Sequence, residues 1–135
     1  MKVALVNSCR YIGGAELWQI RFGKFLQGQG DAVHFFLRRG QFAELAKKQG
    51  FAVTGIRMGF DLDPLGIMGL YTGLKAFGPE AALFNDQRDF RLGVIAAGLA
   101  GVPLKVQRKG FSFLKGSFRD RIYYARLDYV AAVSR

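Results

Sequence analysis

Two adjacent glycines, Gly13 and Gly14, stand where an apolar segment changes into a helical pattern. Glycine accepts backbone angles that other residues resist, and the unpaired N–H groups and dipole of a helix start favour an anion. The pair is neither the dinucleotide fingerprint G-x-G-x-x-G nor a P-loop, which needs Gly-Lys-Ser/Thr. A tight turn without any ligand explains it equally well, so the chemistry of this turn alone leaves both interpretations open.

A second polar group, Asn85-Asp86-Gln87-Arg88-Asp89, follows an apolar segment. Asp86 has the chemistry of a general base that takes a proton from an attacking hydroxyl group. The alternative is a helix N-terminus whose acids satisfy free N–H groups and favour the dipole. Asp89 is the better cap of the two aspartates, because it stands nearer the periodic helix pattern.

A third group, Arg108-Lys109, follows the predicted strand Leu104–Gln107. Cations in this position suit a phosphate or another acidic group, although a solvated basic loop explains them too. Seven basic residues and one acid, Asp120, lie between positions 105 and 126, interleaved with Phe and Tyr. Such a stretch fits nucleic acid, a membrane interface, or a helix with one apolar and one solvated face.

The single Cys9 and the single His34 exclude several classes of chemistry. One cysteine forms no internal disulfide, and one Cys with one His makes no zinc site. His34 lies in the middle of a predicted strand, which favours a structural role over a catalytic triad. Cys9 has no evident activating partner, so we expect neither a metal nor a reactive thiol.

These groups are positioned by apolar segments that alternate with helical patterns, which is typical of an α/β fold with a parallel sheet. In the predicted helix Ala15–Gln29, an apolar stripe carries Trp18, Phe22, Phe25 and Leu26, with Gln19 off the stripe. The predicted strands are Lys2–Asn7, Ala32–Leu37, Ala52–Ile56, Glu80–Phe84, Leu104–Gln107 and Tyr129–Val133. The predicted helices are Ala15–Gln29, Gln41–Lys48, Leu65–Phe77, Phe90–Ala100 and Phe118–Arg126. We expect a Rossmann-like three-layer sandwich with a mostly parallel sheet of about six strands.

Length and charge bound the remaining choices. The 135 residues make one domain in size, and the net charge of +10 favours anionic partners. We find neither a secretory leader nor an apolar run long enough to span a membrane. The sequence stops directly after a predicted strand, which favours a truncated chain.

At this point the chain resembles glycosyltransferase family 4, the group 1 transferases of GT-B fold. The resemblance rests on Gly13-Gly14-Ala15-Glu16 after an apolar strand, on Leu99-Ala100-Gly101-Val102-Pro103, and on Asp128-Tyr129-Val130-Ala131-Ala132-Val133-Ser134. It covers essentially the whole chain and implies that residues 1–135 are the N-terminal, acceptor-side half, with the donor-binding C-terminal domain absent.

The resemblance implies a hexosyltransferase-like enzyme that moves a sugar from a nucleotide-sugar to an acceptor, with retention and without a metal or other cofactor. It places Gly13, Gly14 and Glu16 near the donor's phosphate or sugar, with Asp86 as the catalytic candidate. Acceptor contacts would come from Asn85, Gln87, Arg88, Arg108 and Lys109. The isolated half would be inactive.

The departures from the family are local. Many members carry a histidine where this chain has Asn85-Asp86-Gln87, which leaves the role of Asp86 open. The basic loop suits acidic or phosphorylated acceptors, such as a lipid-linked saccharide or lipopolysaccharide core. It also suits docking on an anionic inner leaflet, so we expect a cytoplasmic, peripheral membrane protein of cell-envelope synthesis.

The alternative is a basic Rossmann-like module that binds nucleic acid or a nucleotide. Nucleic acid is the weaker partner of the two. A dinucleotide site is disfavoured because Arg38-Arg39 stand where an acid would end the second strand.

Overall fold

The computed structural model describes residues 1–57, 63–85, 87–109 and 129–132. Asp86 and the predicted helix Phe118–Arg126 lie outside these ranges.

The described residues form one sheet of six strands, all parallel to their neighbours. The strands are β1 (Lys2–Asn7), β2 (Ala32–Leu37), β3 (Ala52–Gly55), β4 (Ala81–Phe84), β5 (Leu104–Lys109) and β6 (Tyr129–Ala132). Their order is β3-β2-β1-β4-β5-β6. The chain builds outward from β1 in one direction and then in the other. The boundary between β1 and β4 is therefore the topological switch point, where α/β sheets bind their ligands.

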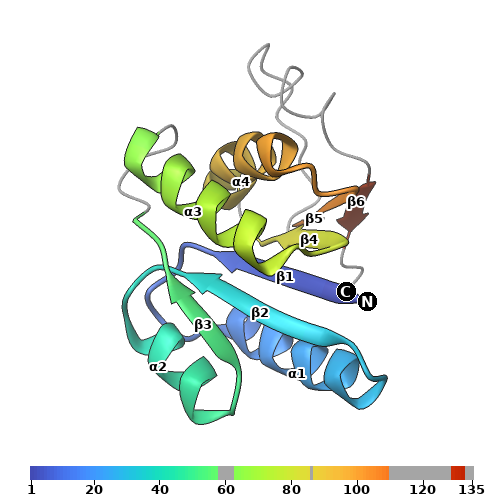
Figure 1. Cartoon of the computed structure of the whole chain (residues 1–135). Coiled ribbons are helices and arrows are strands. Elements are labelled where there is room, and N and C mark those ends of the chain that lie inside the picture. Colours follow the sequence, from blue (N-terminus) through green and yellow to red (C-terminus); the bar gives the residue numbers. More distant parts are fainter. Residues whose placement is uncertain (58–62, 86, 110–128, 133–135) are drawn as a thin grey trace.

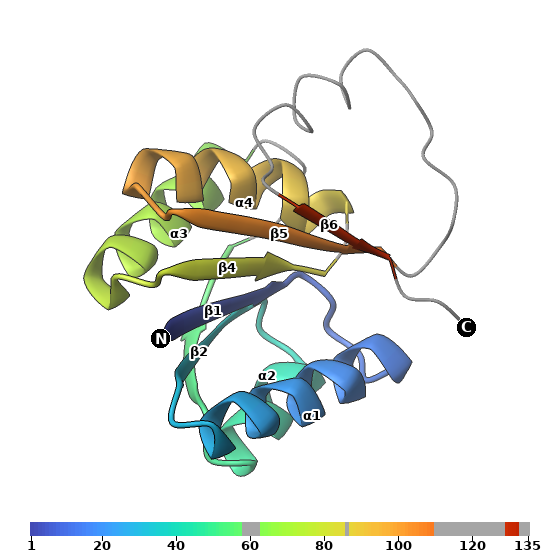
Figure 2. The ribbon, with the colours of Figure 1, turned by 90° about the vertical axis from the view of Figure 1, so that its right-hand side faces the viewer.

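Among the described residues, four helices cover the two faces of the sheet (Figure 1). One face carries α1 (Gly14–Gly28) and α2 (Gln41–Lys48), and the other carries α3 (Pro64–Phe77) and α4 (Gln87–Ala100). The side view shows the sheet between these two helical layers (Figure 2). The predicted Rossmann-like three-layer sandwich is confirmed.

Most predicted boundaries agree with the structure to within one residue, but two need correction. The segment Arg108-Lys109 is not a loop, because β5 continues to Lys109 and pairs with β6 through Arg108–Ala131 and Lys109–Ala132. Helix α4 begins at Gln87 and not at Phe90, so Asp89 lies within its first turn and not at the cap. Pairing with β6 extends β5 beyond its apolar pattern, and α4 extends over the polar residues that precede its apolar pattern.

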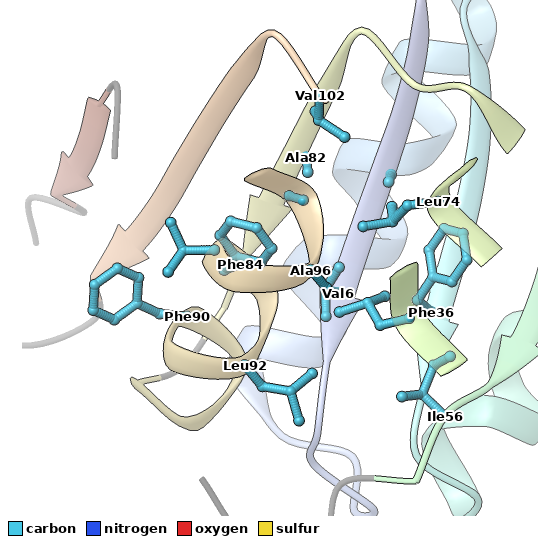
Figure 3. Close-up of a cluster of buried hydrophobic side chains, with 14 residues drawn as sticks. Val6, Phe36, Ile56, Leu74, Ala82, Phe84, Phe90, Leu92, Ala96 and Val102 are labelled. Atoms are coloured by element: carbon cyan, nitrogen blue, oxygen red, sulfur yellow. The ribbon is translucent and has the colours of Figure 1, made fainter. Parts of the chain in front are cut away.

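Each face of the sheet has its own core. Val3 and Leu5 of β1 point toward α1 and α2, whereas Ala4 and Val6 point toward α3 and α4. Every one of these four side chains is at most 5% exposed. Figure 3 shows the core under α3 and α4, where residues from β1, β2 and β4 meet those of the two helices. The unbroken apolar pattern of β1 thus reflects burial on both faces.

Two glycines set the distance of α3 and α4 from the rest of this face. A Cβ atom at Gly66 of α3 would collide with the backbone carbonyl oxygen of Arg57. A Cβ atom at Gly93 of α4 would collide with the ring of Phe84, a fully buried side chain of β4. The absence of a side chain at both positions allows the helices to pack this closely.

Candidate functional site

Three loops meet at the carboxyl end of β1. The N–H of Asn85, just after β4, donates to the carbonyl oxygen of Val6 (3.3 Å). On the other side, the N–H of Arg38, just after β2, donates to the carbonyl oxygen of Asn7 (3.4 Å). The structure therefore places Asn85 beside the carboxyl end of β1, where the loop to α1 begins, at the switch point.

Asn7 is the centre of a buried polar network. Its Nδ2 donates to Glu16 Oε1 (3.1 Å) and to Gln19 Oε1 (2.8 Å), and its Oδ1 accepts from the N–H of Cys9 (2.8 Å). Asn7 and Gln19 are fully buried and Glu16 is 5% exposed. Buried polar groups that are hydrogen-bonded to one another hold their relative positions, because a group that lost its partner would remain buried without a hydrogen bond, at a cost in free energy. The network locks the end of β1 to the first two turns of α1.

Glu16 also closes the glycine turn. Its Oε2 accepts from the N–H of Gly13 (3.0 Å), while the carbonyl oxygen of Gly13 accepts from the N–H of Leu17 (3.1 Å). Glycine has no side chain that could accept from the N–H groups of the first helical turn, so only one half of a capping box forms, in which Glu16 at the third helical position accepts from the N–H of the cap residue. Both carboxylate oxygens of Glu16 thus accept hydrogen bonds from this chain. The predicted contact of Glu16 with a donor stays a prediction.

The backbone of the turn is open to solvent. Gly13 and Gly14 are exposed, and a Cβ atom at Gly14 would meet nothing within 4 Å. The N–H groups of the first helical residues have no acceptor within the helix, so those of Gly14 and Ala15 face outward at its positive end. Tyr11, with 70% of its surface exposed, precedes the turn. A ligand can therefore reach the backbone N–H groups directly.

The turn is also held against α2. Arg10 packs on Gly40, where a Cβ atom would lie 2.8 Å from Arg10 Cβ, and the carbonyl oxygen of Arg10 accepts from the N–H of Phe42 (3.1 Å). The loop from Ser8 to Gly14 is thus tied to the elements on both of its sides. Such support is what a binding loop on a rigid scaffold requires.

Of the other predicted site residues, Asn85 is half-buried at the end of β4. Gln87 and Arg88 are the first two residues of α4 and are separated from Asn85 by Asp86 in the sequence. Arg108 and Lys109 end β5, one strand further from β1. The register Phe84–Gln107 places Arg108 at the same sheet edge as Asn85. Asp86, the catalytic candidate, lies outside the described residues.

Sequence reasoning missed Asn7 and Gln19. It set Gln19 off the apolar stripe of α1 and put Phe25 on it, but Gln19 is fully buried and Phe25 is 60% exposed. The predicted buried face was wrong because the face of α1 that packs on the sheet includes Gln19, whose side-chain oxygen accepts a hydrogen bond from the amide of Asn7. The available signal was Asn7, a polar residue at the end of an apolar strand, which indicates a polar partner close by.

Cys9 belongs to the loop of the site through its backbone N–H, whereas His34 lies in the middle of β2. Burial raises the pKa of the Cys9 thiol, whose Sγ lies 3.5 Å from the carbonyl oxygen of Tyr11. Burial lowers the pKa of His34, whose Nε2 lies 2.6 Å from Thr54 Oγ1. The His34 ring stacks on Phe36 with 4.6 Å between centroids, away from the carboxyl ends of the strands.

In the part of the chain that the structure describes, no group of three or more His, Cys, Asp or Glu side chains is arranged to hold a metal ion. None of the helices described is long and apolar enough to cross a membrane.

Solved structures share this fold. MurG from Acinetobacter baumannii superposes with a TM-score of 0.77 at 16% identity, over 99% of this chain and 41% of MurG. Alr3699/HepE from Anabaena, solved in complex with UDP-glucose, gives 0.74 at 16% identity, over 96% of this chain and 36% of HepE. Each of these two longer chains contains the fold described here as one part. This chain spans about two fifths of the length of MurG.

The fold is not confined to glycosyltransferases. The NAD(P)-binding domain of an exopolyphosphatase-related protein from Archaeoglobus fulgidus gives a TM-score of 0.64 at 13% identity, over 98% of this chain and 86% of that domain. No protein-family model matches the chain, and neither does any curated protein sequence. At such identities the likeness shows the fold, and function has to be argued from the site.

Proposed function

We propose that this chain is the N-terminal, acceptor-side half of a nucleotide-sugar-dependent glycosyltransferase of family 4. The observation that carries the proposal is the exposed Gly13-Gly14 turn at the switch point, held rigid by Asn7 and Glu16. Its outward N–H groups offer hydrogen bonds to a phosphate or sugar oxygen without any rearrangement. The similarity to HepE, solved with UDP-glucose, supports this ligand class.

In this proposal the donor contacts Gly13 and Gly14, and Glu16 acts by fixing the turn. The acceptor lies along the same edge, against Asn85, Gln87, Arg88, Arg108 and Lys109, with Asp86 as the catalytic candidate. A second α/β domain holds the nucleotide, transfer retains the anomeric configuration without a metal, and residues 1–135 alone are inactive. The basic charge suits acidic or phosphorylated acceptors of the cell envelope at the cytoplasmic face of the membrane.

The test is a charge placed at Gly14. Gly14→Asp adds a carboxylate where a Cβ atom meets nothing within 4 Å, and an acid in the first helical turn is compatible with folding. Because the second domain holds most of the nucleotide in this proposal, residues 1–135 should bind UDP-glucose weakly, through its phosphates and sugar. We expect the variant to keep its melting temperature and to lose this weak binding in calorimetric titrations. Gly69→Asp, on α3 and equally free of contacts, adds the same charge elsewhere and should bind like the parent chain. Equal binding by the parent chain and both variants would refute the proposed role of the turn.

The alternative is a nucleotide-binding module, favoured by the fold shared with the NAD(P)-binding domain. It predicts tight binding of NADP to the chain alone, with Arg38 and Arg39 after β2 meeting a ribose phosphate. Weak or absent NADP binding beside measurable UDP-sugar binding favours the transferase.

A further inference from the structure

The outer surface of α3 and α4 is apolar where a soluble surface is usually charged. A pocket of about 370 Å³ lies there, lined by Pro64, Ile67, Met68 and Tyr71 of α3 and by Leu99 of α4. The four α3 residues follow the spacing of one helix face. Met68 and Leu99 are 63% and 66% exposed, and the neighbouring Leu65 is 61% exposed. Contiguous exposed apolar side chains of this size mark a binding surface.

Cations stand around this surface. Lys75 lies one turn beyond Tyr71, with its Nζ 5.8 Å from the centre of that ring. Arg57, whose side chain is 67% exposed, pairs with Asp63 just before α3. Lys105 follows α4 and donates to the carbonyl oxygen of Val102 (3.2 Å). Positive charge is therefore found next to both helices.

Exposed negative charge is missing from the same two helices. The sequences of α3 and α4 contain a single acid, Asp89, and its side chain is fully buried. Asp63, next to α3, is 2% exposed and paired with Arg57. By contrast, α2 on the opposite face carries Glu44 at its surface, with Lys47 3.6 Å away. Glu80, in the loop between α3 and β4, adds one exposed carboxylate at the margin. An apolar centre whose rim carries more cations than exposed acids complements an anionic lipid surface.

We propose that the α3–α4 face docks on an anionic lipid bilayer, with Leu65, Met68 and Leu99 entering the headgroup region. Lys75, Arg57 and Lys105 meet lipid phosphates around them. This deepens the membrane location proposed above by naming the surface, and rests on residues other than the basic loop. Helices α3 and α4 cover a side of the sheet, whereas the Gly13-Gly14 turn lies at its carboxyl edge (Figure 2). The binding edge therefore stays open while this side contacts lipid.

The test is co-sedimentation of the chain with vesicles of equal parts phosphatidylglycerol and phosphatidylcholine. The double variant Met68→Gln/Leu99→Gln keeps helix-forming residues and removes two exposed apolar side chains, which should lower the partition coefficient roughly tenfold. Leu17→Gln/Phe25→Gln is the matched control on α1. The side chains of Leu17 and Phe25 are 42% and 60% exposed, and this variant should bind like the parent chain. Lys75→Glu should weaken binding more than Lys24→Glu on α1, and added salt should remove this difference.

Depth of insertion gives an independent readout. Trp18 is the only tryptophan and lies on the α1 side. In a Trp18→Phe background, a tryptophan replacing Met68 should show blue-shifted emission and quenching by brominated lipid. A tryptophan replacing Phe25 should show neither.

Three results would overturn the proposal. Equal vesicle binding by the α3–α4 variant and its α1 control moves the contact to another surface. Absence of binding to these vesicles by the parent chain removes it altogether. The α3–α4 variant could also change its oligomeric state in light scattering while its vesicle binding stays the same. This result would show that the face is an interface between copies of the chain. None of these depends on UDP-glucose binding, so the proposed function stands or falls separately.

Discussion

The two sides of the sheet solve the same packing problem in different ways. Under α1 and α2, aromatic rings fill the space, and Phe35 packs edge-on against Phe42 and Phe51 with centroids 5.9 Å and 4.8 Å apart. Under α3 and α4, the rings of Phe36 and Phe84 also fill the space, and Cβ atoms at Gly73 and Gly93 would collide with them. On this side, moreover, a Cβ atom at Gly66 would collide with backbone, the carbonyl oxygen of Arg57. Large side chains tolerate small adjustments, whereas a contact with backbone does not.

The same contrast appears at the acids that begin the first helix of each side. Glu16 holds α1 through hydrogen bonds to Asn7 and Gly13, both within the turn that we assign to ligand binding. Asp63 caps α3 by accepting from the N–H of Leu65 (3.1 Å) and pairs with the largely exposed Arg57. On the α1 side the buried acid therefore holds the candidate site, whereas on the α3 side the buried acid caps a helix.

The largest effect should come from Gly66→Ala. Its Cβ atom would meet the carbonyl oxygen of Arg57, so the variant should lose about 3 kcal/mol or more of unfolding free energy. On the other side, Gly23→Ala places its Cβ atom 3.0 Å from the ring of Phe51, which can shift, so we expect a loss of about 1 kcal/mol. Gly69→Ala, with nothing within 4 Å, should gain roughly 0.5–1 kcal/mol. Urea unfolding of the three variants measures this series, and equal losses at Gly66 and Gly23 would remove the contrast between the sides.

A smaller effect should come from the two acids. Glu16→Ala removes the acceptor of Gly13 and one acceptor of the buried Asn7, so it should cost about 2 kcal/mol. Asp63→Ala removes a helix cap and an exposed partner, and it should cost about 1 kcal/mol. Only Glu16→Ala should also weaken UDP-glucose binding. A loss of binding in both variants would show a general effect of stability and not a role in holding the turn.

The smallest effect should be the pH dependence of the α3 side. His34 stacks on Phe36 and on Phe77 of α3, and burial lowers its pKa below the ordinary value of 6.5. The unfolded chain then binds the proton more readily, so stability should fall as the pH drops from about 7.5 to about 5. Because His34 is the only histidine, His34→Gln should flatten this part of the profile in urea unfolding. An unchanged slope in that variant would assign the pH dependence to other groups.

The fold could be predicted from the sequence because each element carries its own signal. Strand β1 and helix α2 were predicted with the bounds that the structure has, since apolar runs and glycine stops are local features. Strand β5 was predicted too short, because its last two residues are strand only through pairing with β6. Pairing with a distant segment leaves no trace in a local pattern.

The site was predictable in part. Gly13 and Gly14 were found from their place after a strand, and the meeting with Asn85 follows from the rule for parallel sheets. The network of Asn7 and Gln19 was not found, because hydrogen bonds between residues twelve positions apart depend on the angle at which α1 packs. Glu16 was found for its motif, but its contacts inside the turn became visible only in the structure.

The most direct test of the account is a map of backbone amide shifts in the ¹⁵N-labelled chain titrated with UDP-glucose. We predict that the amides of Gly13, Gly14 and Ala15 shift most, with that of Asn85 also affected. Those of Gly69 and Gly98 on the other side should stay in place. Shifts centred on Arg38 and Arg39, or spread without preference over both sides of the sheet, would contradict the assignment of the Gly13-Gly14 turn as the ligand-binding edge.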